Sequence, residues 1–551
     1  MSDDRNPVQK GIDYWKNHGA KGFFQRAITK TTGKSFDSMP YKKWLPRHLP
    51  KKKEQEGQRS HVFAYAPLIS ILVENRVVRP VYMRALQESL DSQTYSRWEL
   101  CKGDHPDMHG DYVALVEADS VLSVHALYSC VEYLQGHKET KVLYGDHGQV
   151  SADGRSFDRP CFTPDYNPDL LCSTNYIGHF LVIRRDLYEK TAVQMKNSGV
   201  AGDYERILRL TEATRAIHRI PGMLYHKRIR NASETEDEEM LQVLREHYQR
   251  LGILARAEKG LCPGTYHTIY PITGEPLVSI IIPNKDHIAD LQRCMDSIDQ
   301  KSDYRNYEYI IIENNSTEKE TFAFYSRIQE QNRRIRVVTW EGVFNYSAIN
   351  NYGVSFAKGE YLLFLNNDTE MIRSDCLSEL LGCCMRPETG CVGARLYYED
   401  DTIQHAGTIL GFGSIAGHAF VQQPRTNPGY ENRIMCTQDY SAVTAACMMT
   451  KKSVFEQVGG FTEELAVAFN DVDYCMKTGK SGKLIVYNPY AELYHYESKS
   501  RGLEDTPEKV ERFNREIDLF QKRWEKELEA GDPYYNPNLS LVVQDFSIKP
   551  I

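Results

Sequence analysis

The sequence predicts two tandem α/β domains, each built on a mostly parallel, Rossmann-like sheet, with the first domain shortened. Over residues 277–365, unbroken apolar stretches of strand length alternate with stretches whose apolar residues fall at helical spacing. Such alternation is typical of a parallel sheet that helices cover on both faces. A shorter series of the same kind spans residues 68–119. We also expect a basic N-terminal segment and a C-terminal helix to flank the two domains.

An internal repeat supports the two-domain interpretation. The matched positions, in chain order, are Ser70 with Ser279, Asp119 with Asp368, Asp203 with Asp471, and His226 with His495. The last two positions are 23 residues apart in the first copy and 24 in the second, whereas the first two are 49 and 89 apart. Chance similarity of short apolar strings would not preserve both the order and the late spacing. We infer that the first copy lacks about 40 residues after its opening strand.

The second copy predicts where functional side chains gather. Its expected strands cover residues 277–283, 307–312, 335–340 and 360–365. Glu313 and Asn314 follow the second of these strands, and Asp368 comes shortly after the fourth. Parallel α/β sheets bind their ligands at the carboxyl ends of the strands. We therefore expect these three side chains at one binding edge.

The patterns divide the chain into four segments. They are a basic N-terminal segment at 1–60, the shortened copy at 61–260, the full copy at 270–505, and a C-terminal helix with a tail at 506–551. Within the last segment, residues 506–529 carry one apolar stripe at helical spacing. We expect that stripe to pack on the second domain, since a single apolar face is what a surface helix buries.

Composition and cysteine usage indicate a cytoplasmic protein. The thirteen cysteines include no C-x-x-C pair, which is typical of reduced, buried thiols and not of a zinc site or a disulfide framework. The longest apolar stretches have the length of strands, and the first residues lack the apolar core of a secretory signal. We expect neither a membrane span nor secretion.

The charge is unevenly distributed. Residues 1–60 carry a balance of +8, whereas the whole chain carries −8, so the remainder is strongly acidic. Lysines that surround Trp44 would suit contact with anionic lipid headgroups at the inner face of a membrane. The alternative is a solvated segment that packs on the main domain. The acidic remainder argues against nucleic acid as a partner.

Three positions in the second copy could carry chemistry. Asp368, at the end of a buried strand, suits a divalent cation, although a strand-end aspartate can also cap the next helix. Asp471 and Asp473 are two residues apart and cannot share a helix face, so we expect one of them to face the cleft as a general base. His495 would be a metal ligand or a hydrogen-bonded structural residue.

These motifs together resemble a known family. The matching pieces are residues 278–284, 313–316, 359–368, 458–461 and 470–473. Over 275–500 the chain resembles family 2 glycosyltransferases of the GT-A fold, in the bacterial branch that builds rhamnose-containing and related surface polysaccharides. Residues 61–230 resemble the same family in a degenerate form.

The resemblance implies an inverting transfer of a sugar from a nucleoside diphosphate. Asp368 and His495 would bind Mg²⁺ or Mn²⁺, and Asp471, with Asp473 beside it, would supply the base. The nucleotide pocket would be formed by Pro283, Asn284, Asp286, Glu313, Asn314, Asn351 and Asn367. The implied partners are a dTDP- or UDP-sugar donor and a saccharide acceptor on a lipid carrier, used by a peripheral enzyme at the cytoplasmic face of the membrane.

Two departures from the family pattern keep other functions open. Asn366 stands where the family's metal motif begins with aspartate, and Asn470 stands where a glutamate precedes the base. A catalytically inactive protein that binds glycans or partner enzymes is therefore one alternative. A nucleotidyltransferase is another, although residues 283–286 lack the glycine-rich loop that such enzymes place after the first strand.

Overall fold

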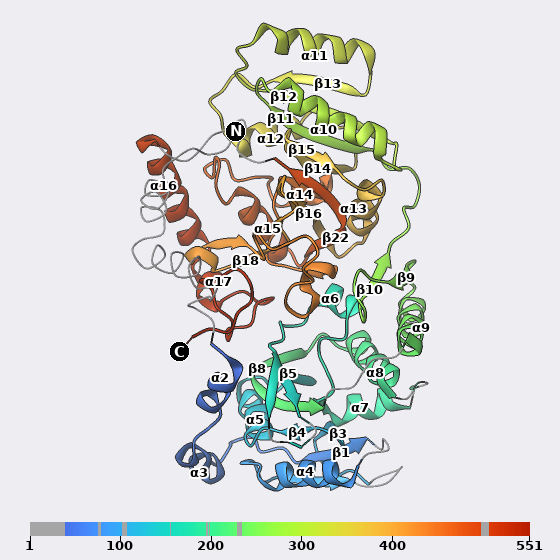
Figure 1. Cartoon of the computed structure of the whole chain (residues 1–551), viewed down its shortest axis with the longest axis vertical. Coiled ribbons are helices and arrows are strands. Elements are labelled where there is room, and N and C mark those ends of the chain that lie inside the picture. Colours follow the sequence, from blue (N-terminus) through green and yellow to red (C-terminus); the bar gives the residue numbers. More distant parts are fainter. Residues whose placement is uncertain are drawn as a thin grey trace.

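The computed structural model describes residues 39–550 except 75–78, 102–106, 152, 155, 194, 196, 198, 229–233 and 497–505. Two large sheets lie in opposite halves of an elongated molecule (Figure 1). Most of the basic N-terminal segment falls outside the described residues. None of the described helices is both long and apolar enough to cross a bilayer.

The first sheet runs in the order β2-β1-β3-β7-β5-β8-β4, with β6 paired to β5. Its strands are β1 (Ile69–Glu74), β2 (Trp98–Cys101), β3 (Tyr112–Glu117), β4 (Val121–Leu122), β5 (Val142–Val150), β6 (Phe157–Cys161), β7 (Leu181–Arg184) and β8 (Ile217–Arg228). The first three strands are mutually parallel, β7 is antiparallel to β3, and β5 is parallel to β8. The sheet is therefore mixed, with a parallel portion at one edge.

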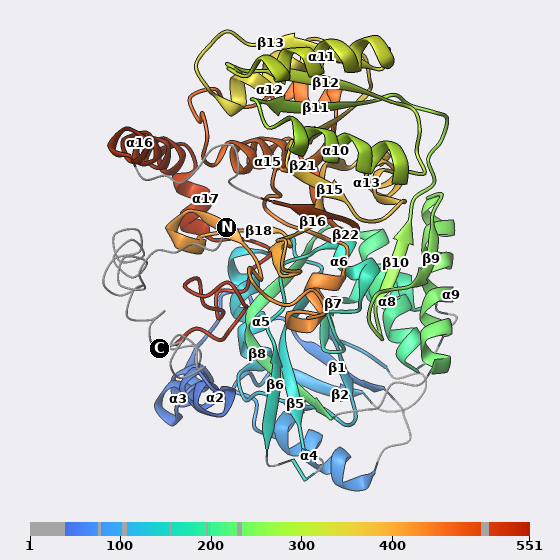
Figure 2. The ribbon, with the colours of Figure 1, turned by 45° about the horizontal axis from the view of Figure 1, so that its top comes forward.

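Helices cover this sheet, and a hairpin leads to the second domain. The helices are α4 (Pro80–Asp91), α5 (Ala126–Gly136), α6 (Pro168–Ser173), α7 (Arg185–Ala192), α8 (Gly199–Ala213) and α9 (Glu234–Leu251). The hairpin of β9 (Arg256–Lys259) and β10 (Tyr266–Ile269) lies beside α9 (Figure 2). The polypeptide then enters the second sheet.

The second sheet repeats this plan with one more parallel strand. Its order is β13-β12-β11-β14-β21-β16-β22-β15, with β17 on β16 and β20 on β22. The strands are β11 (Val278–Asn284), β12 (Tyr307–Glu313), β13 (Ile335–Thr339), β14 (Tyr361–Leu365), β15 (Thr369–Met371), β16 (Thr389–Tyr397), β17 (Ile403–His405), β20 (Gln438–Asp439), β21 (Cys447–Lys451) and β22 (Leu484–His495). A separate hairpin joins β18 (Thr408–Leu410) to β19 (Ala416–His418).

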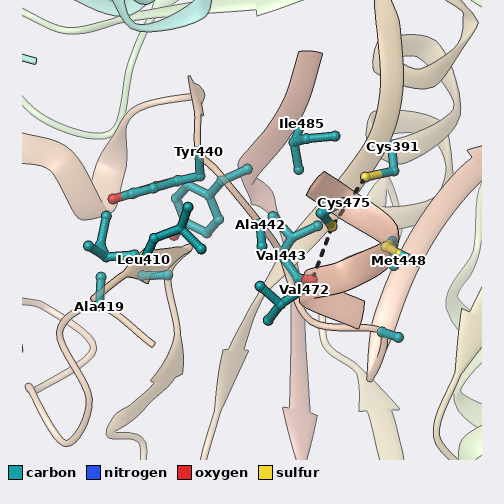
Figure 3. Close-up of a cluster of buried hydrophobic side chains, with 14 of the residues drawn as sticks. Cys391, Leu410, Ala419, Tyr440, Ala442, Val443, Met448, Val472, Cys475 and Ile485 are labelled. Atoms are coloured by element: carbon teal, nitrogen blue, oxygen red, sulfur yellow. Dashed lines mark hydrogen bonds between the residues drawn. The ribbon is translucent and has the colours of Figure 1, made fainter. Parts of the chain in front are cut away.

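The helices of the second domain include the one that carries the candidate base. They are α10 (Ile288–Lys301), α11 (Lys319–Gln331), α12 (Tyr346–Val354), α13 (Cys376–Met385), α14 (Lys452–Gln457) and α15 (Asn470–Lys480), with short 3₁₀ turns at Phe412–Ser414 and Tyr430–Met435. Buried residues of α15, among them Val472 and Cys475, pack toward Cys391 and Met448 of the sheet (Figure 3). This packing fixes the position of the first turn of α15.

Matching hydrogen bonds confirm the predicted repeat. The Ser279 hydroxyl donates to Glu308 Oε1 at 2.7 Å and accepts from the Gly359 amide at 2.8 Å. In the first domain Ser70 donates to a glutamate at 2.6 Å and accepts from a glycine amide at 2.8 Å. In both domains this bonding joins three neighbouring parallel strands, so the two copies share one internal arrangement.

The shortening of the first copy is confirmed as well. In the first sheet β2 is the edge strand, whereas its counterpart β12 is followed by β13. The elements α11, β13 and α12 have no counterpart among the described residues of the first domain. The predicted fold class, two tandem α/β domains with the first shortened, is therefore confirmed.

The two flanking segments pack on the domains. In α2 (Tyr41–His48), Trp44 is buried against Phe162, so its ring is not at the surface; α3 (Lys52–Ser60) follows. The predicted C-terminal helix divides at Trp524 into α16 (Pro507–Arg523) and α17 (Glu525–Ala530). Phe520 and Trp524 of the predicted stripe are buried as expected, whereas Val510 at the helix start is exposed.

A buried ion pair joins the two domains. Arg386, after α13, binds both carboxylate oxygens of Asp169 at 2.6 and 2.8 Å, and the Asp169 amide donates to Asp439 of β20. Burial opposes ionisation of Asp169, but Arg386 outweighs it and lowers the pKa of that carboxyl. Burial and the charge of Asp169 raise the pKa of Asp439. The charge of Arg386 thus favours the ionised form of both buried acids, Asp169 and Asp439, at the interface between the domains.

Removal of that guanidinium should destabilise the protein strongly. Arg386→Gln leaves the Asp169 carboxylate buried without its cation, and we expect unfolding to become easier by about 3–5 kcal/mol in a denaturant titration. The matched control is Arg373→Gln, which breaks a half-buried pair with Asp375 that solvent still reaches and should cost at most about 1 kcal/mol. Equal effects of the two substitutions would contradict this role of Arg386.

Candidate active site

The sheet brings the two predicted metal ligands together. Strand β15 pairs antiparallel with β22, so that Thr369 lies opposite His495. Tyr496 donates its amide to the Asp368 carbonyl at 2.9 Å, which holds the two chain segments in register. As a result His495 Nε2 lies 3.2 Å from Asp368 Oδ1, and both side chains are buried.

Gln404 determines how the His495 ring is oriented. Its Nε2 donates to the His495 carbonyl at 3.2 Å, so its Oε1 is the atom that faces His495 Nδ1 at 2.6 Å. The ring nitrogen Nδ1 must therefore carry the proton in that hydrogen bond. Nε2 then presents its lone pair toward Asp368 and also lies 3.1 Å from the Asn366 amide nitrogen. Gln404 comes from β17, outside the predicted site.

This arrangement fits a divalent cation. With Nδ1 protonated, His495 Nε2 and the Asp368 carboxylate are two electron-pair donors only 3.2 Å apart. Such a contact needs a positive charge, supplied by a second ring proton or by a shared metal ion. An imidazole nitrogen and a carboxylate oxygen are common ligands of Mn²⁺, Zn²⁺ and related ions, and a glutamine that accepts from the other ring nitrogen is typical support for a histidine ligand.

Asp471 and His495 line the same small pocket. The pocket has a volume of about 210 Å³ and is lined by Asp471, His495, Asn366, Gln404, Tyr346 and their neighbours. The amide of Val472 donates to Asp471 Oδ1 at 2.8 Å, and the amide of Ala445 donates to Oδ2 at 3.2 Å. Both amides hold the carboxylate in place at the pocket.

Tyr346 of α12 lines the pocket, and nearby negative charges affect its pKa. Its hydroxyl donates to the Ala445 carbonyl at 3.1 Å. Burial, followed by the negative charges of Asp471 and Asp368, raises the pKa of Tyr346. Its side chain stays a neutral hydrogen-bonding group between the two carboxylates at neutral pH.

Asp473 does not reach the pocket. Its carboxylate is fully buried on another face of α15 and accepts from the Thr462 hydroxyl at 2.6 Å and from Trp524 Nε1 at 2.9 Å. Arg523 and Lys477 complete its surroundings at 3.1 and 3.4 Å. The arrangement ties α15 to the C-terminal helices, and of the two predicted aspartates only Asp471 lines the pocket.

A second group of predicted residues gathers around Asn284, directly after Pro283 at the end of β11. Asn284 accepts from the Asn367 side chain at 2.6 Å and donates to the Asp286 carbonyl at 2.9 Å. The Asp286 carboxylate accepts from the amides of Thr317 and Glu318 and so caps the start of α11. Asn367 is adjacent to Asp368, so this group of residues lies next to the Asp368–His495 pair.

The remaining predicted residues support loops. Asn314 donates to the carbonyls of Trp340 and Gly342, and Glu313 accepts from the Ser316 amide. These contacts hold the turn after β12 against the loop after β13. Asn351 instead exchanges two hydrogen bonds with the backbone of Phe461, so the structure does not bring it to the Asn284 group.

Because the Asp473 carboxylate is buried among hydrogen-bond donors and positive charges, its loss should reduce the stability of the protein. In Asp473→Asn an amide replaces an oxygen that only accepts, and the charges of Arg523 and Lys477 lose their partner, so we expect a loss of about 1–3 kcal/mol. The measurement is denaturant unfolding of the purified protein. Asp518→Asn, an exposed change on α16, is the control and should stay within about 0.5 kcal/mol. An unchanged stability of Asp473→Asn would show that the buried network is dispensable.

Comparison with known proteins finds relatives over most of the chain. The chain is 37% identical over 532 residues to an uncharacterized protein of Sinorhizobium fredii, covering 87% of this chain and 58% of that protein. It is 34% identical over 508 residues to an O-antigen biosynthesis protein of Myxococcus xanthus, covering 88% and 39%. It is 27% identical over 123 residues to an N-acetylglucosaminyl-diphospho-decaprenol L-rhamnosyltransferase of Mycobacterium tuberculosis, covering 21% and 40%.

The chain thus spans about half the length of the two relatives that it matches most extensively. The family model described as glycosyl transferase family 2 matches residues 279–459, which run from β11 to just beyond α14 and include Asn284, Asp368 and Gln404. The second domain of this chain is a family 2 glycosyltransferase domain.

Proposed function

We propose that the second domain transfers a sugar from a nucleoside diphosphate to a saccharide acceptor, with inversion, in the synthesis of a bacterial surface polysaccharide. The observation that carries this proposal is the pocket lined by both Asp471 and His495, whose ring contacts Asp368. A transfer of this kind needs a proton acceptor on one side of the reacting carbon and charge neutralisation on the other. The pocket offers both within a few side chains.

Asp471 is the proposed proton acceptor. The two backbone amides that donate to its oxygens fix the carboxylate at the pocket wall. An acceptor hydroxyl that enters the pocket would lose its proton to Asp471 while its oxygen attacks the donor sugar. A direct attack of this kind displaces the leaving diphosphate from the opposite face, which gives inversion.

Asp368 and His495 would hold Mg²⁺ or Mn²⁺, and the ion would neutralise charge on the leaving diphosphate. Asn366 lies beside His495 Nε2 and would orient the ring or an oxygen of the donor. The Asn284–Asn367 pair lies next to Asp368. The capped turn at Asp286 follows, and Glu313 and Asn314 lie beyond it. We propose this continuous polar edge as the binding surface for the nucleoside, with UDP or dTDP as the carrier.

The names of the relatives support a lipid-linked acceptor. One relative is named for O-antigen biosynthesis and another for transfer onto a diphospho-decaprenol. We propose that this chain acts on a saccharide carried by a lipid diphosphate, at the cytoplasmic face of the membrane. Incubation with a panel of nucleotide sugars and Mn²⁺ tests the activity, and donor binding without any transfer would favour the inactive glycan-binding alternative.

Substitution of the base should separate transfer from binding. Asp471→Asn keeps the size and the backbone contact to one oxygen but cannot take a proton, so turnover should fall about 10²–10⁴-fold. Donor affinity, measured by calorimetry, should stay close to that of the wild type. Asp518→Asn is the control and should transfer normally. A fully active Asp471→Asn enzyme, or an equal loss in Asp473→Asn per folded molecule, would contradict the assignment.

Removal of the hydrogen bond between Gln404 and His495 should weaken metal binding. Gln404→Leu removes the acceptor for His495 Nδ1, and the Mn²⁺ concentration for half-maximal transfer should rise about 10–100-fold. Gln404→Glu keeps an acceptor oxygen and should restore much of that affinity, which a purely structural role would not predict. Chelation of the metal should abolish transfer in the wild type. Transfer that survives chelation would rule out a metal-dependent reaction.

A further inference from the structure

The first domain contains a second cluster of potential metal ligands. Glu117 ends β3, His179 lies just before β7, and Asp203 lies on α8, with one ligand atom from each within 4.8 Å of the others. His179 Nδ1 is 2.9 Å from Asp203 Oδ2 and 3.6 Å from Glu117 Oε2. Both carboxylates are buried, and the histidine side chain is only 12% exposed.

The cluster occupies the same place in its sheet as the candidate active site of the second domain. Ser70 pairs with Val113 as Ser279 pairs with Leu362, so Glu117 takes the position of Asn366. Asp203 matches Asp471 in the repeat. The first domain therefore has a carboxylate where the second has an amide, and it adds an imidazole beside the counterpart of the proposed base.

The ligand set nevertheless differs from the one that the repeat predicts. In the second domain Thr369 lies opposite His495. In the first domain the residue opposite His226 is Val121, which lies one position beyond the counterpart of Thr369. The position of His495 is thus taken by Lys227, and the sequence match of His226 with His495 is wrong by one residue. A slip of one residue turns a strand side chain to the other face. His226 accordingly meets the Tyr41 hydroxyl of α2 at 2.6 Å.

A further imidazole lies next to the cluster. His147 of β5 is 7% exposed, and its Nδ1 has no hydrogen-bond partner among the described residues. A Cβ atom on Gly178 would lie 3.4 Å from that nitrogen, so the ring edge faces the residue before His179. Burial, followed by the positive charge of Lys227, holds the pKa of His147 well below its usual value. A neutral imidazole with an unsatisfied nitrogen thus borders the site.

We propose that Glu117, His179 and Asp203 bind a divalent transition-metal ion in the first domain. One imidazole with two carboxylates is a ligand set used for Mn²⁺, Zn²⁺ and Co²⁺. Three protein ligands leave coordination positions open for an oxygen-bearing ligand such as a phosphate. The competing explanation is a protonated His179 that is shared by two carboxylates without any metal.

Equilibrium dialysis of the full-length chain against Mn²⁺, after removal of metals with a chelator, tests the proposal. Asp368→Asn removes the candidate site of the second domain, and this protein should still bind one Mn²⁺ per chain. Addition of His179→Gln or Asp203→Asn to that background should weaken the remaining binding at least tenfold. His137→Gln, an exposed histidine of the same domain, is the matched control and should leave binding unchanged. Circular dichroism verifies the fold of each variant.

Two results would overturn the proposal. The first is that the Asp368→Asn protein, in which the cluster is intact, binds none of Mn²⁺, Zn²⁺ and Co²⁺. Alternatively, its bound ion could persist with unchanged affinity in both the His179→Gln and the Asp203→Asn backgrounds. Neither result concerns transfer by the second domain, because every arm of the experiment lacks the Asp368 carboxylate.

Discussion

The candidate active site depends on the pairing of one three-residue strand, β15, with the end of β22. That pairing carries His495, more than a hundred residues further along the chain, to within 3.2 Å of Asp368. The carbonyl of Asp368 accepts from Tyr496 and keeps the two segments aligned. Because strand side chains alternate between faces, a shift of one residue would remove His495 from the pocket.

The first domain shows the effect of such a shift within the same molecule. Its equivalent strands pair one residue out of register, and the histidine that the repeat predicts for its site packs under Tyr41 instead. A different histidine, from the segment before β7, approaches the counterpart of Asp471. The two domains therefore share a sheet and a hydrogen-bonded serine–glutamate–glycine arrangement, yet they place different side chains at the same edge.

Sequence patterns predicted much of the fold because the strands are continuous and apolar and the late spacing of the repeat is almost constant. They also predicted one site for Asp368, His495 and Asp471, since all three follow strand ends or begin a helix; in the structure His495 contacts Asp368 and lines one pocket with Asp471. They could not separate Asp471 from Asp473, because that choice depends on Trp524 and Arg523, far along the chain. They did not predict that Gln404 would support His495, because that role depends on the alignment of β17, nor the amide of Ala445, which no side-chain pattern can reveal.

We propose that Asp368 and His495 share one cation, which contacts a nucleoside diphosphate. Pulsed electron paramagnetic resonance of Mn²⁺ with UDP, in a His179→Gln protein that lacks the other cluster, identifies the ligands of that ion. We expect nitrogen coupling from one imidazole, which disappears in His495→Gln, together with phosphorus coupling from the diphosphate. Mn²⁺ that shows phosphorus coupling but no nitrogen coupling, or a nitrogen coupling that persists in His495→Gln, would rule out His495 as the ligand.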